Sequence, residues 1–264
     1  QVPIGAQYVL VVDGDQFALD PSATEVWFPP GHSRAANKPG GVVDQANFPR
    51  AVATPWPRPR PQRRTSRPLV IYEAHVRGLT ALRQRPDAGT FRAAIAELPR
   101  LVDLGVSVLE LLPVHQFDPD EGNYWGYMPL VFAAVHRQYA AGTFAAEELA
   151  DLVAAAHQHD IEVWLDVVVN HTTEADPAGP SYSLRALDET AYYALCHDGT
   201  YLDDAGTGNV VDVLSAPSRR LIMDALDRLA DLGVDGFRFD LAAVLARDGD
   251  FVRAIGDWGQ RRGV

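Results

Sequence analysis

The stretch Gly233-Val-Asp-Gly-Phe-Arg-Phe-Asp240 combines the pattern of a buried strand with a charged pair at its end. Its valine and two phenylalanines are the β-branched and aromatic side chains that a buried strand favours. Arg238 and Asp240 are two residues apart, so on a strand both side chains leave by the same face. A guanidinium beside a carboxylate favours the ionised acid. The pair is either a structural ion pair or a carboxylate held ready as a nucleophile, and the octapeptide leaves both open.

Apolar strands alternate with helical patterns from residue 69 onward. The predicted strands are Leu69–Val76, Val106–Val114, Ile161–Asn170 and Val234–Leu241. The predicted helices are Thr90–Leu104, Ala145–His159, Ser218–Leu232 and Asp250–Gln260, and Pro99 is expected to bend the first of them. Strands that are apolar throughout and alternate with helices indicate a parallel sheet with helices covering its outer face.

Two α/β folds fit this alternation, and the ends of the strands decide between them. A doubly wound sheet is expected to carry a glycine-rich turn after its first strand, whereas this strand ends Tyr72-Glu-Ala-His-Val-Arg-Gly78. A (β/α)8 barrel gathers functional residues at the carboxyl ends of many strands. Polar residues stand at those ends here: His75, Arg77, His115, Asn170, His171 and Asp240. We therefore predict the first half of a (β/α)8 TIM barrel over residues 69–264.

The residues before the barrel have a different composition. Two apolar runs flank Asp13-Gly14, which predicts a β-hairpin, and residues 20–50 show no periodicity and are expected to be irregular. Residues 1–50 are therefore expected to be the end of a small β domain whose beginning is absent, because the chain starts at Gln1 rather than methionine. Residues 51–68 alternate proline with arginine and predict an extended linker rather than a recognition motif.

Composition excludes several classes of partner. The net charge of -12 and the pI of about 5.0 argue against a nucleic acid or an anionic membrane. A single cysteine, Cys196, cannot form an internal disulfide and fits a reducing compartment, so a cytoplasmic protein is expected. No apolar run approaches the length of a transmembrane helix.

The third predicted strand carries a second group of polar residues. Asp166 interrupts an apolar run and needs a partner if it is buried, which Arg238 on the neighbouring strand could supply. His171 at the strand end is either a satisfied histidine or a ligand contact, and its position favours the contact. A cluster of acids at Asp118, Asp120 and Glu121 lacks the glycine and final glutamate of an EF-hand loop, so the residues predict no metal or other cofactor.

These segments together resemble a known family. Asp166-Val-Val-Val-Asn-His171 and Gly236-Phe-Arg-Phe-Asp240 look like the first two signature regions of the α-amylase superfamily of glycoside hydrolases. Three further segments are similar to its isoamylase and bacterial glycogen-debranching branch: Tyr72–Thr80, Leu109–His115 and Gly122–Pro129. The N-terminal hairpin resembles the end of the β-sandwich starch-binding-type module that precedes the barrel in this branch. The resemblance runs from about Val9 to about Asp248.

The resemblance implies a role for each matching residue. Asp240 matches the catalytic nucleophile and Arg238 the arginine that keeps it ionised. Tyr127 matches the aromatic residue that stacks on the sugar in the cleaved subsite, and His171 the histidine that contacts that sugar. Asp166 and Asn170 match residues that support the site. Calcium binds some superfamily members, but these residues give it no independent support.

The implied function is the retaining hydrolysis of α-1,6 branches in an α-glucan such as glycogen or limit dextrin. A branching enzyme and a trehalose-releasing hydrolase of the same superfamily are alternatives. The family's general acid/base is a glutamate on the fifth barrel strand, which this chain does not contain. The 264-residue chain alone is therefore expected to be inactive, and a non-catalytic carbohydrate-binding fragment is the alternative from another class.

Overall fold

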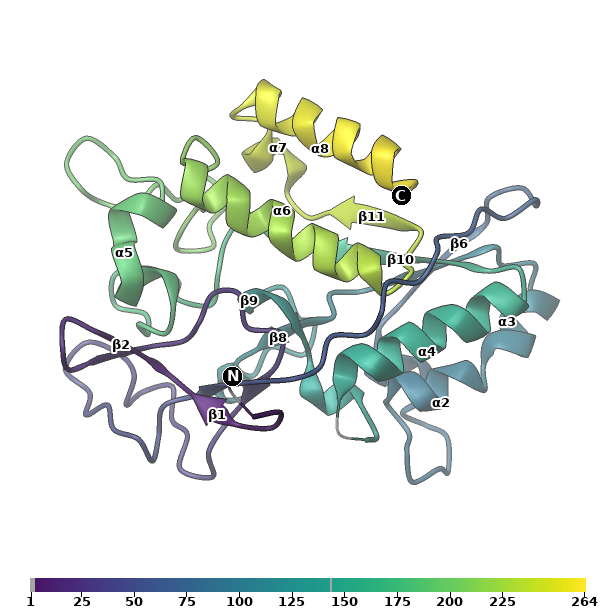
Figure 1. The fold of residues 1–264 in the computed structure, drawn as a ribbon, viewed down its shortest axis with the longest axis horizontal. Coiled ribbons are helices and arrows are strands. Elements are labelled where there is room, and N and C mark those ends of the chain that lie inside the picture. Colours follow the sequence, from purple (N-terminus) through teal and green to yellow (C-terminus); the bar gives the residue numbers. More distant parts are fainter. Residues whose placement is uncertain (1–2, 143) are drawn as a thin grey trace.

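A parallel sheet of four strands forms the centre of the protein. The computed structural model describes residues 3–142 and 144–264. The strands are β6 (Ile71–Ala74), β7 (Val108–Leu111), β10 (Glu162–Val167) and β11 (Gly236–Phe239). They lie side by side in the order β11-β10-β7-β6, and every pair is parallel (Figure 1). Spatial order follows chain order without the reversal that defines a doubly wound sheet, as expected for part of a (β/α)8 barrel.

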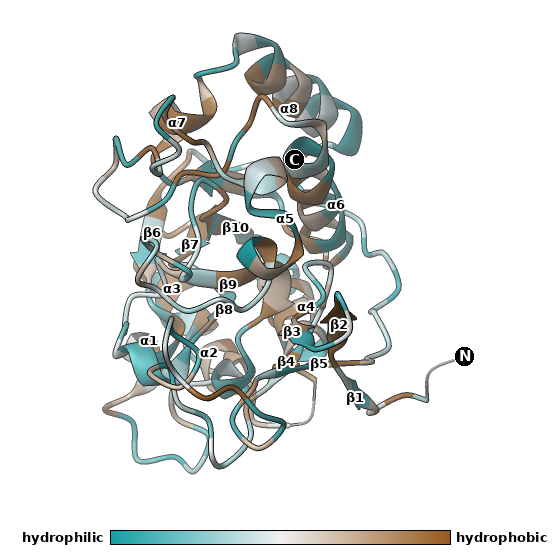
Figure 2. Ribbon diagram, turned by 90° about the vertical axis from the view of Figure 1, so that its left-hand side faces the viewer, coloured by the Kyte–Doolittle hydropathy of each residue, from teal (hydrophilic) through white to brown (hydrophobic). Residues whose placement is uncertain are grey.

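Helices cover one face of this sheet at the predicted places. They include α4 (Ala145–Gln158), α6 (Ala216–Asp231) and α8 (Gly249–Arg262). Both α6 and α8 carry apolar and polar residues, as amphipathic helices do (Figure 2). The helix predicted over residues 90–104 is instead two short helices, α2 (Phe91–Ile95) and α3 (Leu98–Asp103). Pro99 lies in the first turn of α3, where its missing N–H group is tolerated, and so it marks a new helix start.

One face of the sheet is apolar, and the other carries charged residues. Leu109, Leu111, Val163 and Leu165 alternate along β7 and β10 and belong to a buried cluster with residues of α4 and α6. The intervening residues point to the other face, which would be the interior of a barrel. That face carries charged residues, namely Glu73, Glu110, Asp166 and Arg238. The polar site therefore lies on the face that the helices leave uncovered.

Several elements were not predicted from the sequence. Strands β8 (His115–Phe117) and β9 (Pro129–Val135) form an antiparallel pair between the second and third barrel strands. The short helices are α1 (Val76–Thr80), α5 (Leu184–Tyr192) and α7 (Ala242–Leu245), with 3-10 turns at Pro119–Glu121 and Arg137–Tyr139. Every residue of β9 is buried, so its pattern carries no alternation that would mark a strand. Strand β9 forms because β8 is present to pair with it, so the local sequence does not predict it.

The N-terminal part is a set of short strands. The predicted hairpin is confirmed as β2 (Leu10–Val12) and β3 (Gln16–Ala18), whose turn residues Asp13 and Gly14 have φ of 51° and 96°. A three-stranded antiparallel sheet joins β1 (Gln7–Tyr8), β5 (Arg50–Val52) and β4 (Val26–Trp27). The prediction of a wholly irregular segment over residues 20–50 is wrong at β4 and at the start of β5. These pairings join residues distant in sequence, so no local pattern announces them.

The proline- and arginine-rich segment is extended and crosses the molecule from the N-terminal strands toward β6 (Figure 1). Its side chains donate to main-chain carbonyls of the two long helices. Arg60 Nη1 lies 2.6 Å from the Ala150 oxygen, and Gln62 Nε2 lies 2.8 Å from the Ala230 oxygen. Thr65 N donates to Glu162, the first residue of β10, at 2.7 Å. The segment thus lies along the end of the sheet where the strands begin, opposite the candidate site. No helix in the described residues is long and apolar enough to cross a membrane.

Candidate active site

The charged pair that ends strand β11 forms a three-residue ion cluster. Asp166 and Arg238 are register partners on adjacent strands, and Arg238 Nη1 lies 3.0 Å from Asp166 Oδ1. The same nitrogen lies 3.0 Å from Asp240 Oδ1. Burial opposes the charge on Arg238, but its hydrogen bonds to Asp240 and Asp166 raise the pKa of the guanidinium above its usual value. One permanently charged nitrogen is therefore shared by two carboxylates.

Tyr127 completes the contacts of Asp166. Its hydroxyl donates to Asp166 Oδ2 at 2.7 Å, and burial followed by this bond raises the pKa of Tyr127 above its usual range. Burial likewise raises the pKa of Asp166, although the bonds from Tyr127 and Arg238 oppose that rise. The loop before Tyr127 requires a glycine, because Gly126 has φ of 86° and a Cβ there would lie 2.8 Å from the Pro113 oxygen.

His171 links the end of strand β10 to the same loop. Its Nε2 lies 2.6 Å from the Tyr127 carbonyl oxygen, and its Nδ1 lies 2.9 Å from the side-chain amide of Asn170. The histidine is 2% exposed, and burial lowers its pKa despite the bond to Tyr127, so the ring is neutral near pH 7. A neutral ring that donates from Nε2 to Tyr127 presents Nδ1 as an acceptor, and the NH2 group of Asn170, which has no other partner among the described residues, donates to it. The structure thus brings all six residues singled out from the sequence into one chain of contacts: Asn170, His171, Tyr127, Asp166, Arg238 and Asp240.

The backbone turns sharply directly after Asp240. The Asp240 N–H still bonds to the Val167 oxygen at 3.0 Å, as a continuation of the sheet. The next residue, Leu241, has φ of 44°, in the left-handed region that a branched side chain seldom adopts. Such a conformation costs of order 1 to 3 kcal/mol and is most often found at functional sites. The Asp240 side chain lies at the carboxyl end of strand β11 and is 15% exposed.

Three other carboxylates near the barrel strands serve the fold. Glu162 lies at the start of β10, where it accepts from the arginine-rich segment. Glu174 is buried and accepts from three main-chain N–H groups, those of Tyr182, Ser183 and Arg185. Asp248 caps α8. None of the three occupies a position on the inner face beside Arg238.

Glu110 is an inner-face residue to which sequence reasoning gave no role. It lies on β7 opposite Glu73, and it is 8% exposed. Burial, followed by the charges of Glu73 and Asp166, raises the pKa of Glu110 above its usual value. The signal was present in the sequence, since a lone acid within the apolar run of β7 resembles Asp166 within β10. By contrast, His115 is fully buried, with Nδ1 2.8 Å from the Phe132 oxygen and Nε2 accepting from Val168 N, so it serves the fold.

Comparison with known proteins places these observations in a family. Residues 53–210 match the family described as alpha amylase, catalytic domain. A glycogen debranching enzyme of Klebsiella pneumoniae (strain 342) is 38% identical over 244 residues, which are 86% of this chain and 36% of that protein. A glycogen operon protein GlgX homolog of Mycobacterium tuberculosis (strain ATCC 25618 / H37Rv) is 41% identical over 211 residues, 73% of this chain and 29% of that protein. The chain thus spans about a third of the length of these curated relatives.

Solved structures show the same architecture. A pullulanase from Anoxybacillus sp. LM18-11, complexed with maltotetraose, superposes with a TM-score of 0.72 at 25% identity. The match covers 95% of this chain and 38% of the pullulanase. The catalytic module of the glycogen-degrading pneumococcal virulence factor SpuA gives a TM-score of 0.71 at 27% identity, over 94% of this chain and 39% of that module.

Proposed function

Since the chain belongs to the α-amylase catalytic-domain family, we propose that the protein hydrolyses α-1,6 branch linkages of glycogen and related α-glucans by a retaining mechanism. The observation that carries the proposal is the cluster of Asp240, Arg238 and Asp166. A retaining glycosidase needs an ionised carboxylate as nucleophile beside the sugar. Arg238, 3.0 Å from Asp240 and itself held by Asp166, favours that ionised state.

The remaining residues of the site are assigned by the same proposal. Asp240 attacks the anomeric carbon, and Tyr127 stacks on the sugar whose bond is cleaved. His171, whose Nε2 lies 2.6 Å from the Tyr127 carbonyl oxygen, contacts the same sugar. Asp166 and Asn170, both 1% exposed, hold Arg238 and His171 in place.

The choice of α-1,6 linkages rests on the relatives. One is named a glycogen debranching enzyme, and two solved structures are a pullulanase with maltotetraose and a glycogen-degrading module. A branching enzyme and a trehalose-releasing hydrolase share the same core residues and remain the competing activities. The curated relatives extend well beyond the matched part, so activity is proposed for the whole protein.

A second carboxylate must protonate the leaving oxygen, at about 5 Å from the nucleophile in a retaining enzyme. Glu162, Glu174 and Asp248 are engaged elsewhere in the fold. We place the acid/base in a part of the protein that corresponds to the unmatched length of the relatives. We also propose that residues 1–50 are the end of a β-sandwich glucan-binding module, which the short antiparallel strands there support.

The test is a product assay on glycogen limit dextrin, with the 264-residue chain and with the full translation product of its gene. Release of linear maltooligosaccharides by the full product supports the proposal. Free trehalose, or an increase in branch points, would replace debranching with one of the competing activities. Glucan binding without hydrolysis by either product would leave a carbohydrate-binding protein.

A further inference from the structure

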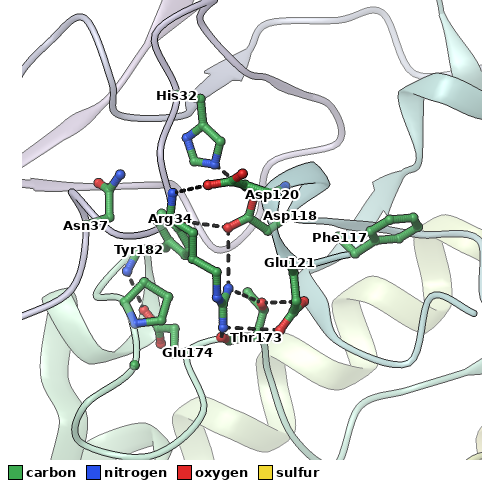
Figure 3. A network of polar contacts seen from close by, with 12 residues as sticks. His32, Arg34, Asn37, Phe117, Asp118, Asp120, Glu121, Thr173, Glu174 and Tyr182 are labelled. Atoms are coloured by element: carbon green, nitrogen blue, oxygen red, sulfur yellow. Dashed lines mark hydrogen bonds and ion pairs between the residues drawn. The ribbon is translucent and has the colours of Figure 1, made fainter. Parts of the chain in front are cut away.

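An arginine of the N-terminal segment reaches the loop that carries His171 (Figure 3). Arg34 Nη2 lies 2.7 Å from the Thr173 carbonyl oxygen, and Arg34 Nη1 lies 2.8 Å from the Thr173 hydroxyl. The same guanidinium pairs with Asp118, Nη1 to Oδ2 at 3.3 Å, and with Glu121, Nη2 to Oε1 at 3.1 Å. Four oxygen atoms from two loops therefore surround one side chain that is 14% exposed.

The acids around Arg34 are held by further contacts. Asp118 is fully buried and accepts from His32 Nε2 at 2.8 Å and from the Tyr182 hydroxyl at 2.6 Å. Burial works to raise the pKa of Asp118, but these hydrogen bonds outweigh it and keep the pKa below the usual range. Asp118 thus stays ionised near pH 7. Of the three acids weighed from the sequence as metal ligands, Asp118 and Glu121 pair with the Arg34 guanidinium, and Asp120 accepts from the Arg34 main-chain N–H.

Two hydrogen bonds connect Thr173 and the neighbouring His171 to the loop that carries Tyr127. Thr173 N donates to the Pro129 oxygen at 2.9 Å, and His171 Nε2 lies 2.6 Å from the Tyr127 oxygen. Thr173 follows His171 by two residues, and Pro129 follows Tyr127 by two residues. Two hydrogen bonds therefore join segment 127–129 to segment 171–173. Arg34 bonds Thr173, the last residue of the second segment.

We propose that Arg34 is a positioning residue for His171 and Tyr127, which it places from outside the barrel by fixing Thr173. The inference rests on the proposed function, because there His171 and Tyr127 contact the sugar. Misplacing a substrate contact by about 1 Å can lower the rate of an enzyme by about a hundredfold. Replacing Arg34 by alanine would loosen the two joined segments that carry His171 and Tyr127.

Arg60 supplies a matched control. It belongs to the same N-terminal third and also bonds one carbonyl, that of Ala150 at 2.6 Å, and one carboxylate, that of Asp151 at 2.8 Å. Both partners lie on α4, and Arg60 has no contact with segments 127–129 or 171–173 among the described residues. Arg34→Ala should lower thermal stability more than Arg60→Ala, because it leaves the buried Asp118 without its guanidinium. The two variants are therefore compared well below both unfolding temperatures, where a difference at His171 reports positioning.

The measurement, made on the full translation product of the gene, is the nuclear magnetic resonance of the His171 imidazole, identified with a His171→Gln variant, together with hydrolysis of limit dextrin. Arg34→Ala should shift the His171 signals and speed exchange of the Nε2 proton about tenfold. A factor of ten corresponds to about 1.4 kcal/mol, which is the size of one hydrogen bond. It should also lower kcat by about tenfold or more with a smaller change in KM. Millimolar methylguanidinium should restore both, whereas methylammonium should not, because it lacks the planar fork.

His171 signals and kcat that are unchanged in Arg34→Ala, or changed equally in Arg60→Ala, would overturn the proposal. Equal rescue by the two cations would also overturn it. If Arg34→Ala does not fold, Thr173→Val takes its place, since it removes the hydroxyl that bonds Arg34 at constant volume, and the same shift of His171 is expected. If the protein hydrolyses no glucan while the His171 signals respond as described, the proposed function fails and the positioning by Arg34 stands.

Discussion

One nitrogen atom joins the two acids of the candidate site. Arg238 Nη1 lies 3.0 Å from a carboxylate oxygen of Asp166 and 3.0 Å from one of Asp240. Asp166 is 1% exposed, so it can hold Arg238 but cannot reach a substrate, whereas the Asp240 side chain is partly exposed. This difference in burial supports the proposal that Asp240 is the nucleophile and Asp166 its support.

Replacing Asp240 by asparagine should abolish hydrolysis while leaving glucan binding largely intact. The substitution removes the nucleophile without changing the volume of the side chain, so we expect a loss in kcat of roughly a thousandfold or more. Reducing-end release from limit dextrin and the affinity for maltotetraose are measured side by side in the full translation product. A variant that keeps a tenth of the activity would show that another residue is the nucleophile.

Replacing Tyr127 by phenylalanine should separate support from stacking. The ring remains, but Asp166 loses the hydrogen bond that Tyr127 donates at 2.7 Å, and a buried carboxylate becomes poorly satisfied. We expect the free energy of unfolding in urea to fall by about 1 to 3 kcal/mol, with maltotetraose affinity less affected. Tyr124→Phe is the control, because Tyr124 is 44% exposed, and it should change stability by under about 0.5 kcal/mol. Equal effects of the two variants would exclude a special role for the Tyr127 hydroxyl.

Among the elements, the arginine-rich segment, helix α4 and strand β10 meet at one buried acid. Asp235 is fully buried directly before β11, where Oδ1 accepts from Arg63 N at 2.5 Å. Its Oδ2 accepts from His157 Nε2 at 2.9 Å and from Val163 N at 2.8 Å. One carboxylate thus connects the segment, helix α4 and strand β10 at the end of the sheet opposite Asp240.

Asp235→Asn should destabilise the protein by about 2 to 4 kcal/mol. The NH2 group of asparagine cannot accept a hydrogen bond, so it would face one of the groups that donate to Asp235 and leave that group unpaired. Equilibrium unfolding in urea measures the change. Asp224→Asn on the exposed side of α6 is the matched control and should change the free energy of unfolding by under about 0.5 kcal/mol. A loss for Asp235→Asn that is no larger than the control would mean that the three hydrogen bonds of Asp235 contribute nothing to stability.

At the scale of the whole molecule, buried neutral histidines should make the protein sensitive to mild acid. Burial lowers the pKa of His115 to about 4 and that of His136 to about 3, and it also lowers the pKa of His171. In the unfolded chain each takes up a proton near pH 6.5. Between pH 6.5 and pH 4 the unfolded state therefore binds more protons at His115 and His136, so the free energy of unfolding falls as the pH falls, by up to about 1.4 kcal/mol per pH unit for each of these two histidines. His171 contributes in the same direction.

Urea unfolding at several pH values from 7 to 4.5 tests this expectation. His136→Gln should unfold more easily at pH 7 but show a smaller decline with falling pH, because one of the titrating groups is gone. His197→Gln, at an exposed position, should keep the decline of the unsubstituted protein. The same decline in all three proteins would assign the acid sensitivity to other groups.

The sequence alone determined the alternation of the barrel strands and helices, and the barrel class. Both rest on local patterns: apolar strands, helical spacing, and polar residues such as Asp240 at strand ends. Tyr127 and the roles proposed for the site residues came from the resemblance to the α-amylase superfamily. The tertiary structure decided what local patterns cannot encode. Strands β4, β5, β8 and β9 exist through pairing, and the arginine-rich segment lies against the sheet because carbonyls and acids distant in sequence face it. The grip of Arg34 on Thr173 joins residues 139 positions apart, a contact that only the folded chain creates.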